Sequence, residues 1–165
     1  MTGENRMTNG LERGVTMVES LVALVVLSVG MLGIASLHLT SLKSGRSALI
    51  RTQAVNLVND MADRIRANPV ARGSYDTGLY APAPAPRNCV TVANCSTDEL
   101  AEDDLARWIA QVDATLPNAA SEVLFNAAAA AGRPDTYSVR VAWREAGEEQ
   151  DFSYETAVNF IPVLP

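Results

Sequence analysis

Glu19 is a carboxylate within a long apolar stretch of the sequence. Apart from His38, it is the one ionisable side chain in residues 15–42, which are otherwise apolar, small or uncharged. About 20 apolar residues suffice to cross a bilayer as a helix, so this stretch is long enough. A carboxylate at mid-bilayer costs on the order of 2.5–3.5 kcal/mol, so we expect Glu19 to have a cationic partner or to lie near the membrane surface. A carboxylate is also mildly favoured in the first turn of a helix, which leaves a local explanation open.

The two cysteines, Cys89 and Cys95, are the second candidates for chemistry. They lie six positions apart in a loop-like part of the sequence. In an exported domain the surroundings are oxidising, so a disulfide closing a small loop is expected, with two free thiols as the alternative. A metal site would need further cysteine or histidine ligands, and His38 lies in the apolar stretch. We therefore expect no metal.

The composition argues against an enzyme and against a nucleic-acid partner. No serine or cysteine of the polar part of the chain has a histidine available for a catalytic triad, and no glycine-rich phosphate loop occurs. The chain has 165 residues and a net charge of −6, whereas nucleic-acid binding needs clustered Lys and Arg. We expect no catalytic residue, no cofactor and no nucleic-acid partner.

One long helix is predicted to carry Glu19. Beyond the apolar stretch, apolar residues continue at steps of three and four, which places them on one helix face. The residue before a proline is pushed out of the helical region, so Asn68-Pro69 should end the helix near Ala67. A helix over 15–67 would be roughly 80 Å long at 1.5 Å per residue. The residues of the predicted buried stripe are Ile50, Ala54, Leu57, Val58, Met61 and Ile65.

Residues 68–165 are predicted to form a small globular head. It begins with a loop in which the alternating Ala-Pro segment 81–86 should be extended polyproline II. The capping box from Ser96 to Glu99 predicts a helix over about 97–116. The acidic residues of that helix are expected on its outer face, explained by the first-turn dipole preference. Those acidic residues are Glu102, Asp103 and Asp104.

The end of the chain predicts a β-hairpin over about 136–161. Apolar and polar residues alternate with a period of two on both sides of Gly147, which is typical of antiparallel strands with one buried face. Residues 121–125 could form a further strand, and the conformation of 118–131 is left open. The apolar stripe of the long helix is the surface that the hairpin should cover.

The start of the apolar stretch resembles the signature of a known family. Gly14, followed by Val15-Thr16-Met17-Val18-Glu19 and an apolar helix, is similar to the prepilin signature of type IV pilins and type II secretion pseudopilins. The resemblance implies cleavage between Gly14 and Val15 by a prepilin peptidase, followed by N-methylation of Val15. It also implies that Glu19 contacts the amino terminus of a neighbouring subunit during assembly.

The fold class implied is α+β, a pilin-like lollipop with a long N-terminal helix packed on a small antiparallel sheet. Residues 1–14 would be the leader and 15–42 the transmembrane or filament-core half of the helix. Residues 43–67 would be its amphipathic half and 68–165 the head. Gly30 and Gly33 lie within the membrane half, where they would allow close helix packing or local unwinding inside a filament, or simply reflect membrane-helix composition.

The resemblance implies a minor pilin that helps to start pilus assembly at or near the tip. Its partners would be other minor pilins, the major pilin, the prepilin peptidase, the inner-membrane assembly machinery and, before assembly, the lipid bilayer. It would cross the bacterial inner membrane once with its head in the periplasm, and then move to the cell-surface pilus. The alternatives are a minor pseudopilin of a type II secretion system and a bitopic membrane protein with a periplasmic sensing or binding head.

Overall fold

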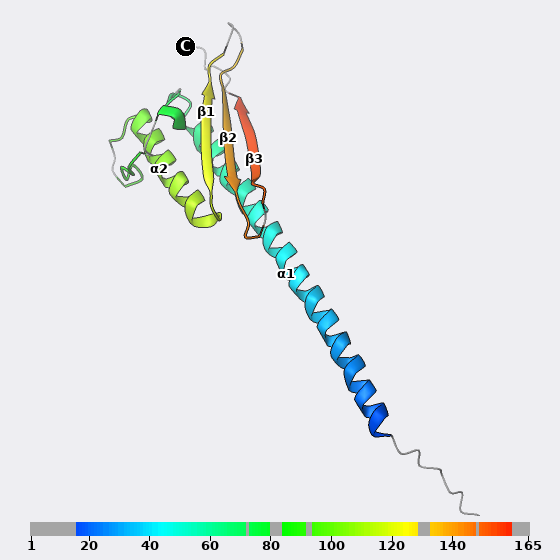
Figure 1. The fold of residues 1–165 in the computed structure, drawn as a ribbon. Coiled ribbons are helices and arrows are strands. Elements are labelled where there is room, and N and C mark those ends of the chain that lie inside the picture. Colours follow the sequence, from blue (N-terminus) through cyan, green and yellow to red (C-terminus); the bar gives the residue numbers. More distant parts are fainter. Residues whose placement is uncertain are drawn as a thin grey trace, which may run out of the picture. The chain divides into compact units, whose positions relative to one another are not determined.

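The chain forms one long helix, a shorter helix and a three-stranded sheet (Figure 1). A computed structural model describes residues 16–71, 73–79, 84–91, 94–128, 133–147 and 149–159. The long N-terminal helix with a small antiparallel sheet confirms the predicted α+β, pilin-like fold class. The elements are α1 (Met17–Ala67), η1 (Thr77–Leu79), α2 (Thr97–Thr115), β1 (Ala120–Asn126), β2 (Thr136–Trp143) and β3 (Phe152–Asn159).

Contacts divide the chain into two compact units, residues 1–45 and 46–165, and α1 runs through both. In the first unit, every described side chain of α1 is exposed. The helix is capped by Thr16, whose Oγ1 accepts a hydrogen bond from the backbone N–H of Glu19 at 3.3 Å. The hydroxyls of Ser28 and Thr40 donate to carbonyls one turn earlier, so these polar groups are satisfied within the helix.

In the second unit, α1 presents the predicted apolar stripe to the core. The helix ends at Ala67, as the Asn68-Pro69 pair predicts. The Asn68 side chain then donates to the carbonyl of Thr97 at 2.8 Å, which connects the end of α1 to the start of α2. The buried residues of this part of α1 are Ile50, Ala54, Leu57, Val58, Met61, Ala62 and Ile65.

The sheet has the order β1-β2-β3 and is antiparallel throughout. Val139 of β2 lies opposite Val123 of β1 and Thr156 of β3. The predicted alternation places Tyr137, Val139, Val141 and Trp143 on the buried face of β2. This face shares one core with the stripe of α1 and with Leu105, Trp108 and Val112 of α2.

The start of α2 also follows the sequence. Ser96 accepts a hydrogen bond from the backbone N–H of Glu99, and the Glu99 carboxylate accepts one from the N–H of Ser96, which completes the predicted capping box. The segment left open in the sequence contributes β1. The first half of the predicted polyproline segment, residues 81–83, lies outside the described residues.

Candidate assembly surface

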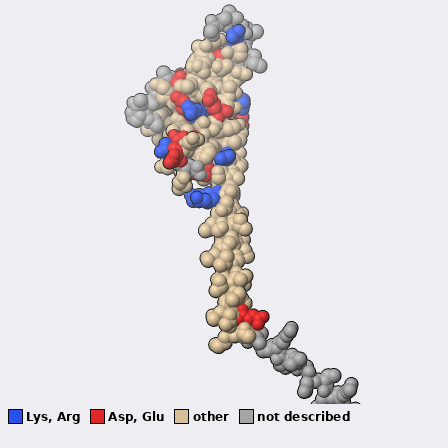
Figure 2. Space-filling view, turned by 45° about the vertical axis from the view of Figure 1, so that its right-hand side comes forward, with Lys and Arg blue, Asp and Glu red and all other residues tan. Residues whose placement is uncertain are grey.

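The part of α1 that lies in the first unit has an apolar surface on all sides. Its large apolar side chains between Met17 and Leu42 are 54–87% exposed. A helix that is apolar all round belongs in a bilayer or in the interior of an assembly, because water solvates it poorly. α1 is long and apolar enough to cross a membrane, judged by length and composition. In Figure 2, the acidic and basic side chains gather mainly over the head.

Glu19 lies in the first turn of this helix and is exposed. Among the described residues, no Lys or Arg forms an ion pair with it. Gly14 and Val15, the expected processing junction, lie outside the described residues. A carboxylate at the end of an apolar helix can pair with an ammonium group brought by another subunit, and in lipid the pairing relieves the cost of both charges.

The structure joins Cys89 and Cys95 in a disulfide. The loop that they close is held in place by Asp103, whose predicted position on the helix surface is wrong. Asp103 was expected on the outside of α2, yet it is only 1% exposed. Its carboxylate accepts hydrogen bonds from the backbone N–H groups of Arg87, Asn88 and Cys89, at 2.7, 3.0 and 3.0 Å.

Arg107, one turn further along α2, donates its Nε to the same carboxylate at 2.9 Å. Burial of Asp103 disfavours its ionised form, but the hydrogen bonds from the three backbone N–H groups and Arg107 outweigh this and hold the pKa of the carboxyl below its usual range. Asn88 has a φ of 62°, a left-handed conformation that helps successive N–H groups to converge on one anion. Asp103 is thus an anchor for the disulfide loop and not a solvated helix charge.

Asp104 is a second correction to the expected outer face. Its carboxylate accepts hydrogen bonds from Arg64 of α1 and from the Tyr75 hydroxyl, both at 2.9 Å. Burial raises the pKa of the Tyr75 phenol, so this group stays protonated and donates. The cluster fastens α2 to the end of α1. The spacing of the apolar residues on α2 does not indicate that the neighbouring carboxylates Asp103 and Asp104 point inward. Their hydrogen-bond partners come from segments far away in the sequence.

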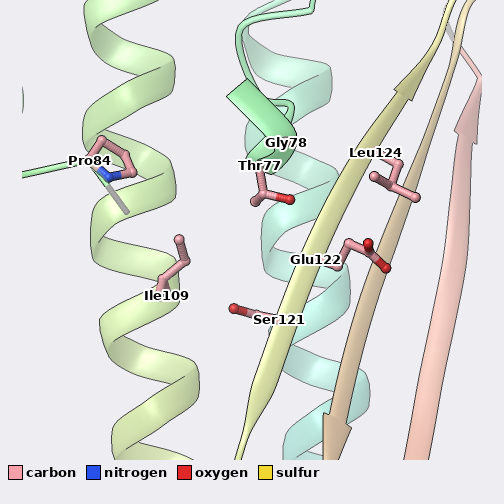
Figure 3. Close-up of a pocket in the computed structure, with 7 residues that line it drawn as sticks. All are labelled: Thr77, Gly78, Pro84, Ile109, Ser121, Glu122 and Leu124. Atoms are coloured by element: carbon pink, nitrogen blue, oxygen red, sulfur yellow. The ribbon is translucent and has the colours of Figure 1, made fainter. Parts of the chain in front are cut away.

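A surface hollow of about 410 Å³ lies between α2, η1 and β1 (Figure 3). Glu122 is the one ionisable side chain among its described lining residues. No group of three or more metal-binding side chains occurs in the part of the chain that the structure describes. Among the described lining residues there is thus no acid–base pair. Its described lining residues are Thr77, Gly78, Pro84, Ile109, Ser121, Glu122 and Leu124.

Residues 36–106 match the family model described as Tt1218-like, type IV pilin Tt1218. The match supports a type IV pilin. The matched segment runs from the apolar half of α1 through the disulfide loop and into α2, so it includes Asp103 and Asp104. No curated protein and no solved structure matches the chain. Pilins are structural proteins, and a pilin with a long apolar N-terminal helix fits anchoring in a membrane followed by assembly into a pilus.

Proposed function

We propose that this chain is a minor pilin of the type IV pilus, of the PilV type, that helps to initiate pilus assembly at or near the tip. One observation carries the proposal. The helix of the first unit is apolar and exposed on all sides and bears a single carboxylate, Glu19, in its first turn. Such a surface needs lipid around it in storage and other helices around it in an assembly.

The proposed processing begins with cleavage by the prepilin peptidase between Gly14 and Val15, followed by N-methylation of Val15. Residues 15–42 hold the pilin in the inner membrane, with the leader in the cytoplasm and the head in the periplasm. Arg13 precedes the apolar stretch, in keeping with a cytoplasmic leader. During assembly, Glu19 pairs with the amino-terminal ammonium of a neighbouring subunit, so that neither charge remains alone in an apolar environment.

The specific assignment to the minor pilin PilV rests on resemblance of sequence over most of the chain. Besides the apolar helix, the similar segments are the loop from Cys89 to Cys95, residues 104–108, Leu116-Pro117 and the strand 137–143. The partners that this assignment implies are other minor pilins, the major pilin and the inner-membrane assembly machinery.

The first test is mass spectrometry of the mature amino terminus in membrane and sheared-pilus fractions. We expect N-methylated Val15 as the first residue in both fractions. A chain that retains its leader at Met1 or Met7 would instead support a bitopic membrane protein with a periplasmic binding head.

The second test is Glu19→Ala, with Ser20→Ala as the matched control in the same helical turn. The variant should be processed and retained in the membrane, while its abundance in sheared pili falls at least about tenfold. A tenfold change corresponds to about 1.4 kcal/mol, less than the cost of an unpaired charge in lipid. Wild-type abundance of Glu19→Ala in sheared pili would contradict the proposed charge contact.

A further inference from the structure

We propose that the outer edge of β3 is a docking site for an extended strand of a different protein subunit, one that carries a Lys or Arg opposite Glu155. This interface lies on the head and is separate from the contact proposed for Glu19. It follows from three features of the sheet: the contrast between its two edges, the direction of the β3 backbone groups, and the charges across the strands.

The edge at β1 is already closed by side chains of the same chain. The hydroxyl of Thr77 donates to the carbonyl of Val123 at 2.9 Å and accepts from its backbone N–H at 3.0 Å. The carboxylate of Asp76 accepts from the N–H of Phe125 at 3.1 Å. These bonds occupy both outward groups of Val123 and the outward N–H of Phe125, so an added strand could not pair with this part of β1.

The register of the strands determines which backbone N–H and C=O groups of β3 point outward. The N–H and C=O of Val123 point away from β2, so Val139 opposite it turns its own groups toward β3. There Val139 pairs with Thr156. The backbone N–H and C=O groups of successive residues in a strand point to opposite edges. The groups of Thr156 point toward β2, so those of Glu155 and Ala157 point away from the sheet. No hydrogen bond from a described residue reaches these outward groups.

The composition of β3 leaves this edge unprotected. Exposed edge strands are commonly blocked by Pro, Lys, a bulge or a very short length. β3 has eight residues, contains neither Pro nor Lys, and has Glu155 as its one charged residue. On its inner face Phe152 and Tyr154 are half-buried against the core, and the Arg51 guanidinium lies over the Phe152 ring, 4.8 Å from its centroid. An added strand would cover part of the exposed surface of Tyr154.

The charges across the sheet indicate which kind of strand would bind beside β3. Glu122, Arg140 and Glu155 lie opposite one another across β1, β2 and β3, so the row alternates between negative and positive. The next position outward, beside Glu155, is complementary to a cation. Glu155 accepts a hydrogen bond from the Ser138 hydroxyl, and no described Lys or Arg forms an ion pair with it. Antiparallel pairing with a second copy through the middle of β3 would bring two Glu155 side chains together, which like-charge repulsion disfavours. A different subunit with a basic residue is therefore the better fit.

The test is photo-crosslinking of the full-length protein in intact cells. A benzophenone amino acid at Ser153, exposed on β3, is compared with the same probe at Asn126, exposed on β1. We expect a crosslink from Ser153 to an extended segment of a different pilus subunit that contains Lys or Arg, identified by mass spectrometry. Ala157→Pro removes an outward N–H and should lower the yield at least tenfold, whereas Ala157→Ser keeps that N–H and should not.

A charge exchange makes the test independent of any folding defect in Ala157→Pro. Glu155→Lys should abolish the Ser153 crosslink, and replacing the basic residue of the captured segment by Glu should restore it. Equal yields from Ser153 and Asn126 would overturn the proposal. So would a crosslink within the same chain or to a second copy, or yields that neither Ala157→Pro nor Glu155→Lys changes. The abundance of Glu19→Ala in sheared pili does not depend on these outcomes, so the two proposals fail separately.

Discussion

Asp103 and Glu19 are carboxylates in opposite circumstances. Asp103 is buried and accepts hydrogen bonds from three backbone N–H groups and Arg107. Glu19 lies in the apolar part of α1, and no described Lys or Arg forms an ion pair with it. The first is satisfied within its own chain and stabilises a fold. The second has capacity left for a partner, which is the property that the proposed assembly contact requires.

Asp103→Asn should lower the free energy of unfolding by about 2 kcal/mol. The amide cannot supply two charged acceptor oxygens, and hydrogen bonds to charged groups contribute about 1.5–3 kcal/mol. Denaturant unfolding of the protein in detergent measures the change. Asp113→Asn, an exposed change on the same helix, should stay within about 0.5 kcal/mol of the wild type.

The effect of Asp103→Asn should also depend on pH. The pKa of Asp103 is lower in the folded state than in the unfolded chain, so the unfolded chain binds the proton more tightly. The stabilisation is fully present above the ordinary aspartate pKa of about 4 and is lost as pH falls through the lower folded value. The difference between wild type and variant should therefore shrink below about pH 4. A difference that stays constant down to pH 2 would contradict a role for the ionised carboxylate.

At the scale of elements, α1 is the surface on which the other parts of the head assemble. The indole N–H of Trp108 donates to the carbonyl of Leu57 at 2.8 Å, inside the core, and this fixes α2 against α1. Trp143 of β2 is also buried, but its indole N–H lies 3.4 Å from the carboxylate of Glu145, a longer bond at a partly exposed partner.

Trp108→Phe should therefore cost more than Trp143→Phe, by about 1 kcal/mol. Both changes remove similar volume, so their difference isolates the buried hydrogen bond. Equilibrium denaturation of the two variants provides the comparison. Equal losses of unfolding free energy would show that the bond to Leu57 contributes nothing beyond packing.

At the scale of the whole molecule, the core lies entirely in the second unit. Every described buried apolar residue lies at or after Ile50, and the unit begins at Arg46. The first unit contributes no described residue to that core. In the proposed function its apolar surface serves membrane anchoring and assembly, whereas the second unit holds the contacts that stabilise the head.

Residues 46–165 should consequently fold alone and stay soluble without detergent. Their unfolding should be cooperative, with a free energy within about 1 kcal/mol of that of the full chain, because the core is complete. Thermal unfolding and size-exclusion chromatography test this. A fragment that starts at Met31 keeps part of the apolar helix and should still need detergent. Aggregation of the 46–165 fragment would show that the head depends on the first unit.

The elements that the sequence predicted correctly have strong local signals. The stripe of α1 follows from its 3.6-residue period, and its end follows from Asn68-Pro69. The capping box marks the start of α2, and alternation marks β2 and β3. The processing junction at Gly14 and Val15 stays a prediction, because those residues lie outside the described part of the chain.

What the sequence alone determined is the α+β layout and the apolar helix with one carboxylate, because periodicity and hydropathy are properties of neighbouring residues. What only the tertiary structure decided is the position of Asp103 and Asp104 and the difference between the edges of β1 and β3. The partners of these groups come from positions far away in the chain: Arg87 for Asp103, Arg64 for Asp104 and Thr77 for Val123. No local pattern encodes such contacts, because only the packing of distant segments creates the places where these polar groups meet.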